Sequence, residues 1–275
     1  TQPPQKSQRG QKINKSPIQG ISETLNIDFR SPEILKDNTE EYNFLKKLNA
    51  DLAIVVAYGK IIPKNFLNLT KKGFINVHAS ILPKWRGAAP IQRSIMNLDD
   101  ETGISIMKIV EELDSGPISN SYKIKLDRNF NAEEISDKLS LLAAEKISDN
   151  IDDIFQEKVK FIDQDHSKAT YAKKIKKNEG EINWNDQAVK IIGKINGLFP
   201  SPGAFFIFNG ERYKILKAEI GNGIGKLGEI VSDKLEIACS NNQSIKVLEI
   251  QREGKKAQKI GEFILGSQIR KGSII

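Results

Sequence analysis

Three polar side chains in the first half of the sequence have types and spacing suited to stabilising an oxyanion. Asn76 and His78 stand two residues apart in the segment FINVH, and Asp114 lies in the turn sequence LDSG. Side chains two apart in a strand share a face, so an amide donor and an imidazole would lie together. Such a pair can stabilise a developing oxyanion. An imidazole also needs a group that orients it or accepts its proton, and Asp114 is the leading candidate.

Each of these residues also has an ordinary structural explanation. An isolated N-x-H sequence is usually structural, and an aspartate before Ser-Gly commonly forms a turn. The chemical interpretation is favoured because all three residues fall at or after the ends of predicted strands. In open α/β sheets, sites form at such strand ends.

The elements that must position these side chains alternate between strand and helix patterns. Strands are predicted at residues 51–57, 74–78, 103–110 and 119–126, the first buried on both faces. Helices are predicted at residues 32–48, 63–69, 87–97 and 131–156. This order indicates an α/β domain with a mostly parallel sheet. If the strands are parallel, Asp114 reaches the sheet edge at which His78 ends.

The two ends of the chain have a different character. Residues 1–20 are rich in Pro and Gly and are expected to form a loop. After a lysine-rich stretch, a helix is predicted at 186–195 and five short strands at 203–208, 213–220, 228–231, 235–238 and 244–250. Five short strands fit a small OB-like β-barrel. We therefore predict a catalytic domain at 1–158, a basic linker at 159–178 and a C-terminal domain at 179–275.

Composition excludes several classes of protein and site. Apolar residues make up 39% of the 275, and the longest apolar run, 52–58, is far shorter than a bilayer requires. A single cysteine, Cys239, excludes an intramolecular disulfide and suits a reducing, cytoplasmic setting; it is expected in the core. The only histidines are His78 and His166, so we expect no multi-histidine metal centre. His166 lies in the polar linker and is expected to be solvated.

The net charge of +7 is unevenly distributed along the chain. Residues 1–18 carry four basic side chains and no acid, whereas residues 19–158 are acidic overall. Residues 159–178 carry six lysines and two aspartates. Basic segments on both sides of an acidic body are typical of a protein that holds a polyanion. The alternative of simply solvated side chains stays open, as it does for the linker lysines Lys168, Lys173, Lys174, Lys176 and Lys177.

The sequence NVHASILPKWRGAAPI, residues 76–91, resembles the signature of the formyltransferases that use 10-formyltetrahydrofolate. The family pattern is N-x-H, then G-S-L-L-P, a basic-aromatic-basic-Gly step and A-x-P-I. An aspartate in a later G/L-D-x-G turn completes it and matches Asp114. The resemblance implies catalytic roles for Asn76, His78 and Asp114, and needs no metal. It also implies a folate pocket lined, partly by backbone, by Ser80, Ile81, Leu82 and Pro83.

The resemblance covers the whole chain and is closest to the branch that formylates methionine on initiator tRNA. That branch has a Rossmann-like domain, a linker and a C-terminal OB-like domain that binds tRNA. The first loop of these enzymes enters the acceptor arm through an arginine, which matches Arg9, while Lys12 and Lys15 would contact phosphates. The resemblance implies an enzyme that moves the formyl group from N10 of the folate to the methionine α-amine. We expect a monomer, because no segment of the sequence has the pattern of a dimer interface.

The sequence departs from the family pattern in three places. Ala79 stands where the family has Gly, and Ile81 stands where it has Leu. Family members also carry a strand and a G-T-P turn before the first loop, so we expect the printed sequence to lack residues that precede Thr1. Trp85 either stacks on an adenosine or packs within the protein.

Three other functions compete with this interpretation. A formyltransferase acting on a sugar-nucleotide amine, or a hydrolase releasing formate, would use the same folate chemistry. The basic first loop and basic linker argue against both. A noncatalytic RNA-binding protein would have no need of Asn76, His78 and Asp114.

Overall fold

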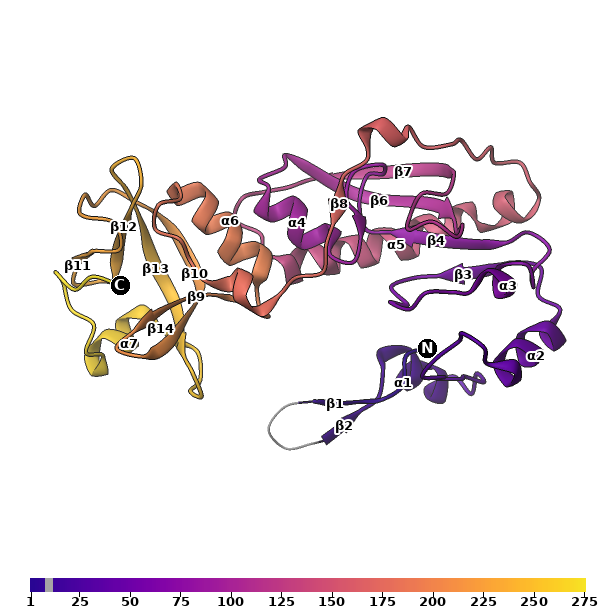
Figure 1. The fold of residues 1–275 in the computed structure, drawn as a ribbon, viewed down its shortest axis with the longest axis horizontal. Helices are drawn as coiled ribbons and strands as arrows, with labels where there is room; N and C mark the ends of the chain where they lie inside the picture. The colour runs from indigo at the N-terminus through magenta and orange to yellow at the C-terminus, as the bar shows by residue number, and fades with distance from the viewer. Residues whose placement is uncertain (8–11) are drawn as a thin grey trace. The chain divides into compact units, whose positions relative to one another are not determined.

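The computed structural model describes residues 1–7 and 12–275, and the chain folds into two compact units. The first unit contains Thr1–His78, Ser105–Ser121 and Glu145–Ser167. The second contains Ala79–Ile104, Tyr122–Ala144 and Lys168–Ile275. Figure 1 follows the chain from the indigo N-terminus to the yellow C-terminus. The sequence-based division at residues 158 and 178 remains a prediction.

The helices and strands follow one another along the chain. In order they are β1 Gln5–Ser7, β2 Lys12–Asn14, α1 Pro17–Thr24, α2 Thr39–Leu48, β3 Ala53–Val55, α3 Lys64–Leu67, β4 Phe74–His78, β5 Arg86–Gly87, α4 Pro90–Met96, β6 Glu101–Lys108, β7 Ile118–Lys125, α5 Ala132–Phe155, the 3₁₀ turn η1 His166–Lys168, β8 Tyr171–Ala172, the 3₁₀ turn η2 Lys177–Gly180, α6 Ala188–Leu198, β9 Ala204–Phe208, β10 Glu211–Gly221, β11 Ile230–Ser232, β12 Glu236–Cys239, β13 Gln243–Arg252, β14 Gln258–Lys259 and α7 Ile260–Gly266.

The N-terminal residues form more regular structure than the loop expected for 1–20. Strands β1 and β2 pair as an antiparallel hairpin. Helix α1 then begins at Pro17, where the Ser16 hydroxyl accepts a hydrogen bond from the Gln19 N–H. Serine at the N-cap and proline in the first turn both favour a helix start, which explains why the helix begins inside the predicted loop.

The sheet that carries Asn76 and His78 is mixed, so the expectation of a mostly parallel sheet is wrong. Its strand order is β3-β4-β6-β7. Strand β4 runs parallel to β3 but antiparallel to β6. A parallel return usually carries a helix across the face of the sheet. The connection from β4 to β6 instead contains the seven-residue α4, which packs against α6.

Two sequence-predicted elements of the first unit are shorter in the structure. The strand expected at 51–57 is reduced to β3, which stands at the end of the four-stranded order. Ile54 is 41% exposed there, so burial on both faces is wrong for this strand. The helix expected at 32–48 begins only at Thr39, because the Asn38 side chain caps it by accepting from the Glu41 N–H at 3.1 Å.

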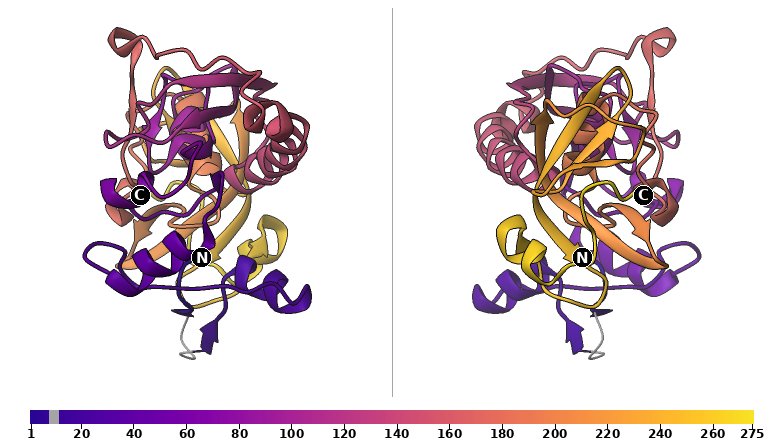
Figure 2. Two further views of the ribbon diagram at one scale, coloured as in Figure 1. Left: turned by 90° about the vertical axis from the view of Figure 1, so that its right-hand side faces the viewer. Right: turned by 90° about the vertical axis from the view of Figure 1, so that its left-hand side faces the viewer.

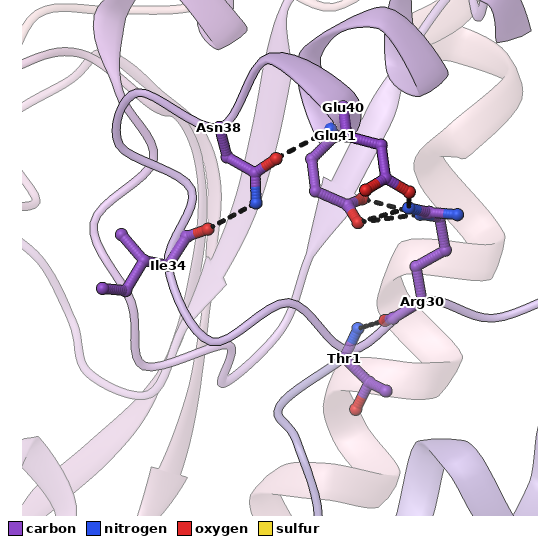
Figure 3. Close-up of polar contacts among 6 residues, drawn as sticks. All are labelled: Thr1, Arg30, Ile34, Asn38, Glu40 and Glu41. Atoms are coloured by element: carbon purple, nitrogen blue, oxygen red, sulfur yellow. Dashed lines mark hydrogen bonds and ion pairs between the residues drawn. The ribbon is translucent and has the colours of Figure 1, made fainter.

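A polar cluster fastens the segment before α2 to that helix (Figure 3). The Arg30 guanidinium donates to both carboxylate oxygens of the buried Glu41 and to Glu40. These bonds raise the pKa of Arg30 above its ordinary value. The Thr1 amino group donates to the Arg30 carbonyl at 2.8 Å. The cluster therefore fixes the start of the β1–β2 hairpin as well.

The C-terminal region is an antiparallel sheet with the strand order β11-β12-β13-β10-β9, and β14 also pairs with β13. All five predicted strands are present, and the helix predicted at 186–195 is α6. Helix α6 packs on β10 and β13, and α7 packs on β13 and β14. Figure 2 shows the orange-to-yellow strands of this sheet and the yellow helix α7 in two further views. These pairings describe a sheet and not a closed barrel, so the OB-like barrel remains a prediction.

The core of this sheet is built from alternating apolar side chains. Fully buried members include Ile191 and Ile195 of α6 and Ile215, Ile237 and Ile245 of the strands. Cys239 is buried in this cluster, as predicted, and burial raises the pKa of its thiol. Across the two described stretches of chain, no helix is long and apolar enough to cross a membrane.

Candidate active site

Strand β4 positions the first two candidate residues. Asn76 lies between Val55 of β3 and Met107 of β6 in the sheet register, and His78 lies opposite Ser105. Their spacing places both side chains on one face of the sheet, as predicted. The His78 side chain is 7% exposed and Asn76 is half-buried. The strand is therefore a rigid support for a donor and an imidazole.

Asp114 lies beside His78, with Oδ2 3.6 Å from the imidazole Nδ1. The proximity agrees with the sequence analysis, but the argument from parallel strands is wrong. Because β6 is antiparallel to β4, its C-terminal end lies near the beginning of β4, where the Ile109 N–H donates to the Phe74 carbonyl. The LDSG loop turns back from that end, and Asp114 takes a left-handed backbone with φ of +46°.

A residue that sequence reasoning missed holds this turn. The amide of Gln164, which is 6% exposed, donates to the carbonyls of Asp114 and Gly116 at 2.9 and 2.8 Å. Gly116 fits tightly there, since a Cβ would lie 2.0 Å from the Lys108 carbonyl oxygen. A single glutamine in a polar stretch carries no pattern that reveals such a contact. Gln164 thus orients the backbone that presents the Asp114 carboxylate to His78.

The four residues expected to line a folate pocket follow β4 directly. Ser80 is fully buried, and its hydroxyl donates to the Lys84 carbonyl at 2.6 Å. Leu82 is 6% exposed, whereas Ile81 and Pro83 are partly exposed. Ile81 packs close to Gly103, where a Cβ would lie 2.5 Å from the Ile81 Cδ1. The Ser80 hydroxyl therefore shapes the turn, and a pocket role for these residues stays a prediction.

Two of the three residues expected to bind tRNA, Lys12 and Lys15, lie in or next to β2. Arg9 lies outside the described residues. Lys12 belongs to β2, and Lys15 follows it with an exposed side chain that pairs with Glu23 at 2.7 Å. The hydrogen bond from Lys15 lowers the pKa of Glu23.

The remaining residues singled out from sequence have clear positions. His166 is exposed in η1, as predicted. Trp85 is half-buried, and its indole N–H donates to Asp99 Oδ2 at 2.7 Å. The five linker lysines have exposed side chains: Lys168, Lys173, Lys174, Lys176 and Lys177. Among residues 1–7 and 12–275, no group of three or more His, Cys, Asp or Glu side chains is arranged to hold a metal ion.

Comparison with known proteins adds independent information. A family model described as formyl transferase matches residues 1–151, and one described as the formyl transferase C-terminal domain matches residues 174–268. The chain is 68% identical over 275 residues to the methionyl-tRNA formyltransferase of Pelagibacter ubique (strain HTCC1062), covering 100% of this chain and 89% of the relative. It is 38% identical over 275 residues to that of Jannaschia sp. (strain CCS1), covering 100% and 90%.

A solved structure extends the comparison to the fold. HypX from Aquifex aeolicus, in complex with tetrahydrofolic acid, superposes with a TM-score of 0.65 at 17% sequence identity. The match covers 85% of this chain and 41% of that one. At this identity the similarity shows a shared fold alone.

Proposed function

The chain belongs to the methionyl-tRNA formyltransferase family, and from this premise we propose how its own residues perform the reaction. The enzyme transfers a formyl group to methionine on initiator tRNA. We take the formyl donor to be 10-formyltetrahydrofolate, which the family signature in residues 76–91 and a folate-bound structural relative support. The observation that carries the proposal is the His78–Asp114 pair, with Asn76 on the same face of β4 as His78.

The reaction exchanges one carbon–nitrogen bond for another. The methionine α-amine attacks the formyl carbon, and the formyl oxygen gains negative charge. The Asn76 amide donates a hydrogen bond to this oxygen, and the His78 imidazole supplies a second donor or a nearby positive charge. When the bond from carbon to the folate N10 breaks, the proton lost by the amine balances the one gained by N10.

Asp114 has two tasks in this scheme. Its carboxylate faces the His78 Nδ1 and so fixes the ring, leaving the other ring nitrogen for the formyl oxygen. It also accepts the proton from the attacking amine, directly or through a water. The separation of 3.6 Å is long for a hydrogen bond and suits a pair that closes when substrates bind.

The tRNA contacts in the proposal come from the two basic segments. Arg9, Lys12 and Lys15 of the first loop and the exposed lysines of 168–177 would meet phosphates, and an OB-like C-terminal sheet would meet the remaining tRNA surface. The folate would lie against Ser80, Ile81, Leu82 and Pro83, with Ile81 and Pro83 as the partly exposed side chains. We expect a monomer in the cytoplasm, where translation takes place.

The test is transfer of labelled formyl from 10-formyltetrahydrofolate to methionine-charged initiator tRNA, with charged elongator tRNA and free methionine as controls. Formylation of the initiator species alone is the expected result. His78→Ala should reduce turnover by about 10²–10³, the cost of losing an oxyanion donor. Its tRNA affinity should stay within a few-fold. A His78→Ala enzyme with substantial activity would refute the assignment.

The same assay distinguishes the competing functions. Formate release without transfer would indicate a hydrolase, and transfer to a sugar-nucleotide amine in place of tRNA would indicate the other formyltransferase class. Binding of tRNA with no formyl transfer by the wild-type chain would favour a noncatalytic RNA-binding protein.

A further inference from the structure

A lysine-rich segment, residues 168–180, lies along the loop that follows the catalytic strand in the sequence. We call these residues the basic strip and residues 83–89 the signature loop. The strands β5 and β8 pair in parallel, with Arg86 opposite Tyr171 and Gly87 opposite Ala172. Both segments belong to the second compact unit. The strip therefore adds a short strand to the signature loop.

Backbone groups of the strip form hydrogen bonds with backbone groups of the signature loop. The N–H of Arg86 donates to the Thr170 carbonyl at 2.9 Å, and the Thr170 N–H donates to the Pro83 carbonyl. The N–H groups of Ala88 and Ala89 both donate to the Ala172 carbonyl, at 2.9 and 3.2 Å. These donors would otherwise need water or another acceptor. The shape of the signature loop thus depends on the strip.

Trp85 shows that the loop is held in an unusual shape. Its φ is +63°, in the left-handed region that bulky residues rarely adopt. The Trp85 N–H donates to the Thr170 Oγ1 at 2.9 Å, while the indole is fixed by Asp99. Such a backbone persists where its surroundings over-determine it, and it is common at functional sites. The Thr170 hydroxyl is a specific part of that restraint.

A second anchor lies near the other end of the strip. The Arg93 guanidinium, on α4, donates to the Lys173 carbonyl from both Nε and Nη2. It also donates to both oxygens of Glu179, at 2.6 and 3.1 Å. The bonds from Arg93 lower the pKa of Glu179, which also accepts from the Lys176 N–H. One arginine therefore binds two points of the strip.

The strip combines a hydrogen-bonded backbone with exposed lysine side chains. Lys173, Lys174, Lys176 and Lys177 are all exposed. The backbone of the strip is bonded to the signature loop at Thr170 and Ala172 and to α4 through the Lys173 carbonyl. Lysines on a fixed backbone present their charges at set positions, which suits a row of phosphates. A tether that merely joined two domains would need no such bonding.

We propose that the basic strip is a positioning element for formyl transfer, with Thr170 and Arg93 as its positioning residues. Thr170 holds Trp85 and the signature loop in their working shape. Arg93 holds the strip, so that RNA phosphates bound by its lysines are placed in register with that loop. The RNA part of this proposal rests on the function proposed above.

The first test compares Thr170→Val with Thr170→Ser. Valine keeps the shape but removes the acceptor for the Trp85 N–H, whereas serine retains it. Thr170→Val should lower kcat by about tenfold, one lost hydrogen bond converted to a rate. Its Kd for methionyl-tRNA should stay within about twofold, and Thr170→Ser should recover most of the rate. Equal kcat in wild type and Thr170→Val, or a Thr170→Ser as impaired as Thr170→Val, overturns the role of Thr170.

The second test needs neither substrate, so it can fail or succeed independently of the proposed function. Trypsin cuts after exposed lysines only where the backbone opens. Cuts after Lys173, Lys174, Lys176 and Lys177, mapped by mass spectrometry, should be slow in wild type and at least about tenfold faster in Arg93→Ala. Lys15→Ala, which breaks an ion pair outside the strip, is the control and should leave these cuts unchanged. Equal cutting rates in wild type and Arg93→Ala would show that the strip is a loose tether and overturn the proposal.

Discussion

The two basic segments, residues 1–18 and the basic strip, look alike in sequence but are built differently. The β1–β2 hairpin is joined to its unit near its base, where Thr1 bonds to Arg30 and Ser16, and Gln2 donates to the Tyr58 carbonyl. The strip is bonded along its length, by main chain to the signature loop and by Arg93 to α4. Similar charge thus occurs on two differently supported segments. We call residues 1–18, which are bonded near the base of the hairpin, the arm, and the basic strip, which is bonded along its length, the brace.

This difference separates the binding of a polyanion from the positioning of the signature loop. Substitutions in an arm should change affinity for a polyanion with little effect on stability. Substitutions in a brace should change stability and rate together, because the signature loop depends on the same bonds.

The largest effect is expected where the strip touches the signature loop most closely. Gly87 has φ of +119°, and a Cβ there would lie 2.8 Å from the Ala172 carbonyl oxygen. Gly87→Ala should push the strip away and lower kcat/KM by about 100-fold, since small misplacements cost about that much. Gly210→Ala is the control, because Gly210 also has positive φ, +76°, but open space around it. If both variants lose activity equally, backbone strain and not the strip contact is responsible.

A smaller effect is expected from the two ion pairs. Arg93 and Glu179 have side chains 18% and 29% exposed, whereas Lys15 and Glu23 are 58% and 39% exposed. Arg93→Ala should lower the free energy of unfolding by about 1–3 kcal/mol, because it leaves the Lys173 carbonyl and the Glu179 carboxylate without this donor. Lys15→Ala should change it little, as is usual for exposed pairs. Urea unfolding measures both, and equal losses would remove the distinction between arm and brace.

The smallest effect is a dependence of stability on pH. The pKa of Glu179 is lowered from its ordinary 4.5, chiefly by Arg93, so its ionised form favours the folded chain. This contribution is complete above pH 4.5 and is lost as the pH falls through the lowered value. The melting temperature of the wild type should therefore exceed that of Glu179→Gln at neutral pH, and this difference should shrink in acid. A difference that is unchanged by acid would show that the carboxylate charge does not stabilise the strip.

The sequence predicted strand β4 well and the rest of the candidate site less well. Phe74–His78 was placed correctly because period-two spacing is a local property. Asp114 was correctly placed beside His78 but on a wrong argument, because strand direction is set by tertiary packing and not by the strand's own residues. The capping of α2 by Asn38 shortened a helix that its apolar spacing extended to residue 32.

Contacts between segments far apart in the sequence produce no local sequence pattern from which they could be predicted. Gln164, Thr170 and Glu179 each bond to a residue at least 50 positions earlier. Each is an ordinary polar residue within a lysine-rich stretch. Composition therefore identified that stretch as a linker, because composition carries no information on which backbone groups of another segment lie opposite it.

These long-range bonds also set an order of assembly during synthesis. The Asp114 turn obtains its Gln164 amide, and Ala88 and Ala89 obtain the Ala172 carbonyl, only after those later residues have been made. A nascent chain that ends before residue 164 contains His78 and Asp114 but not the amide that holds the Asp114 turn. An enzyme that formylates methionyl-tRNA for the start of other proteins thus completes this candidate site only once most of its own chain has been translated.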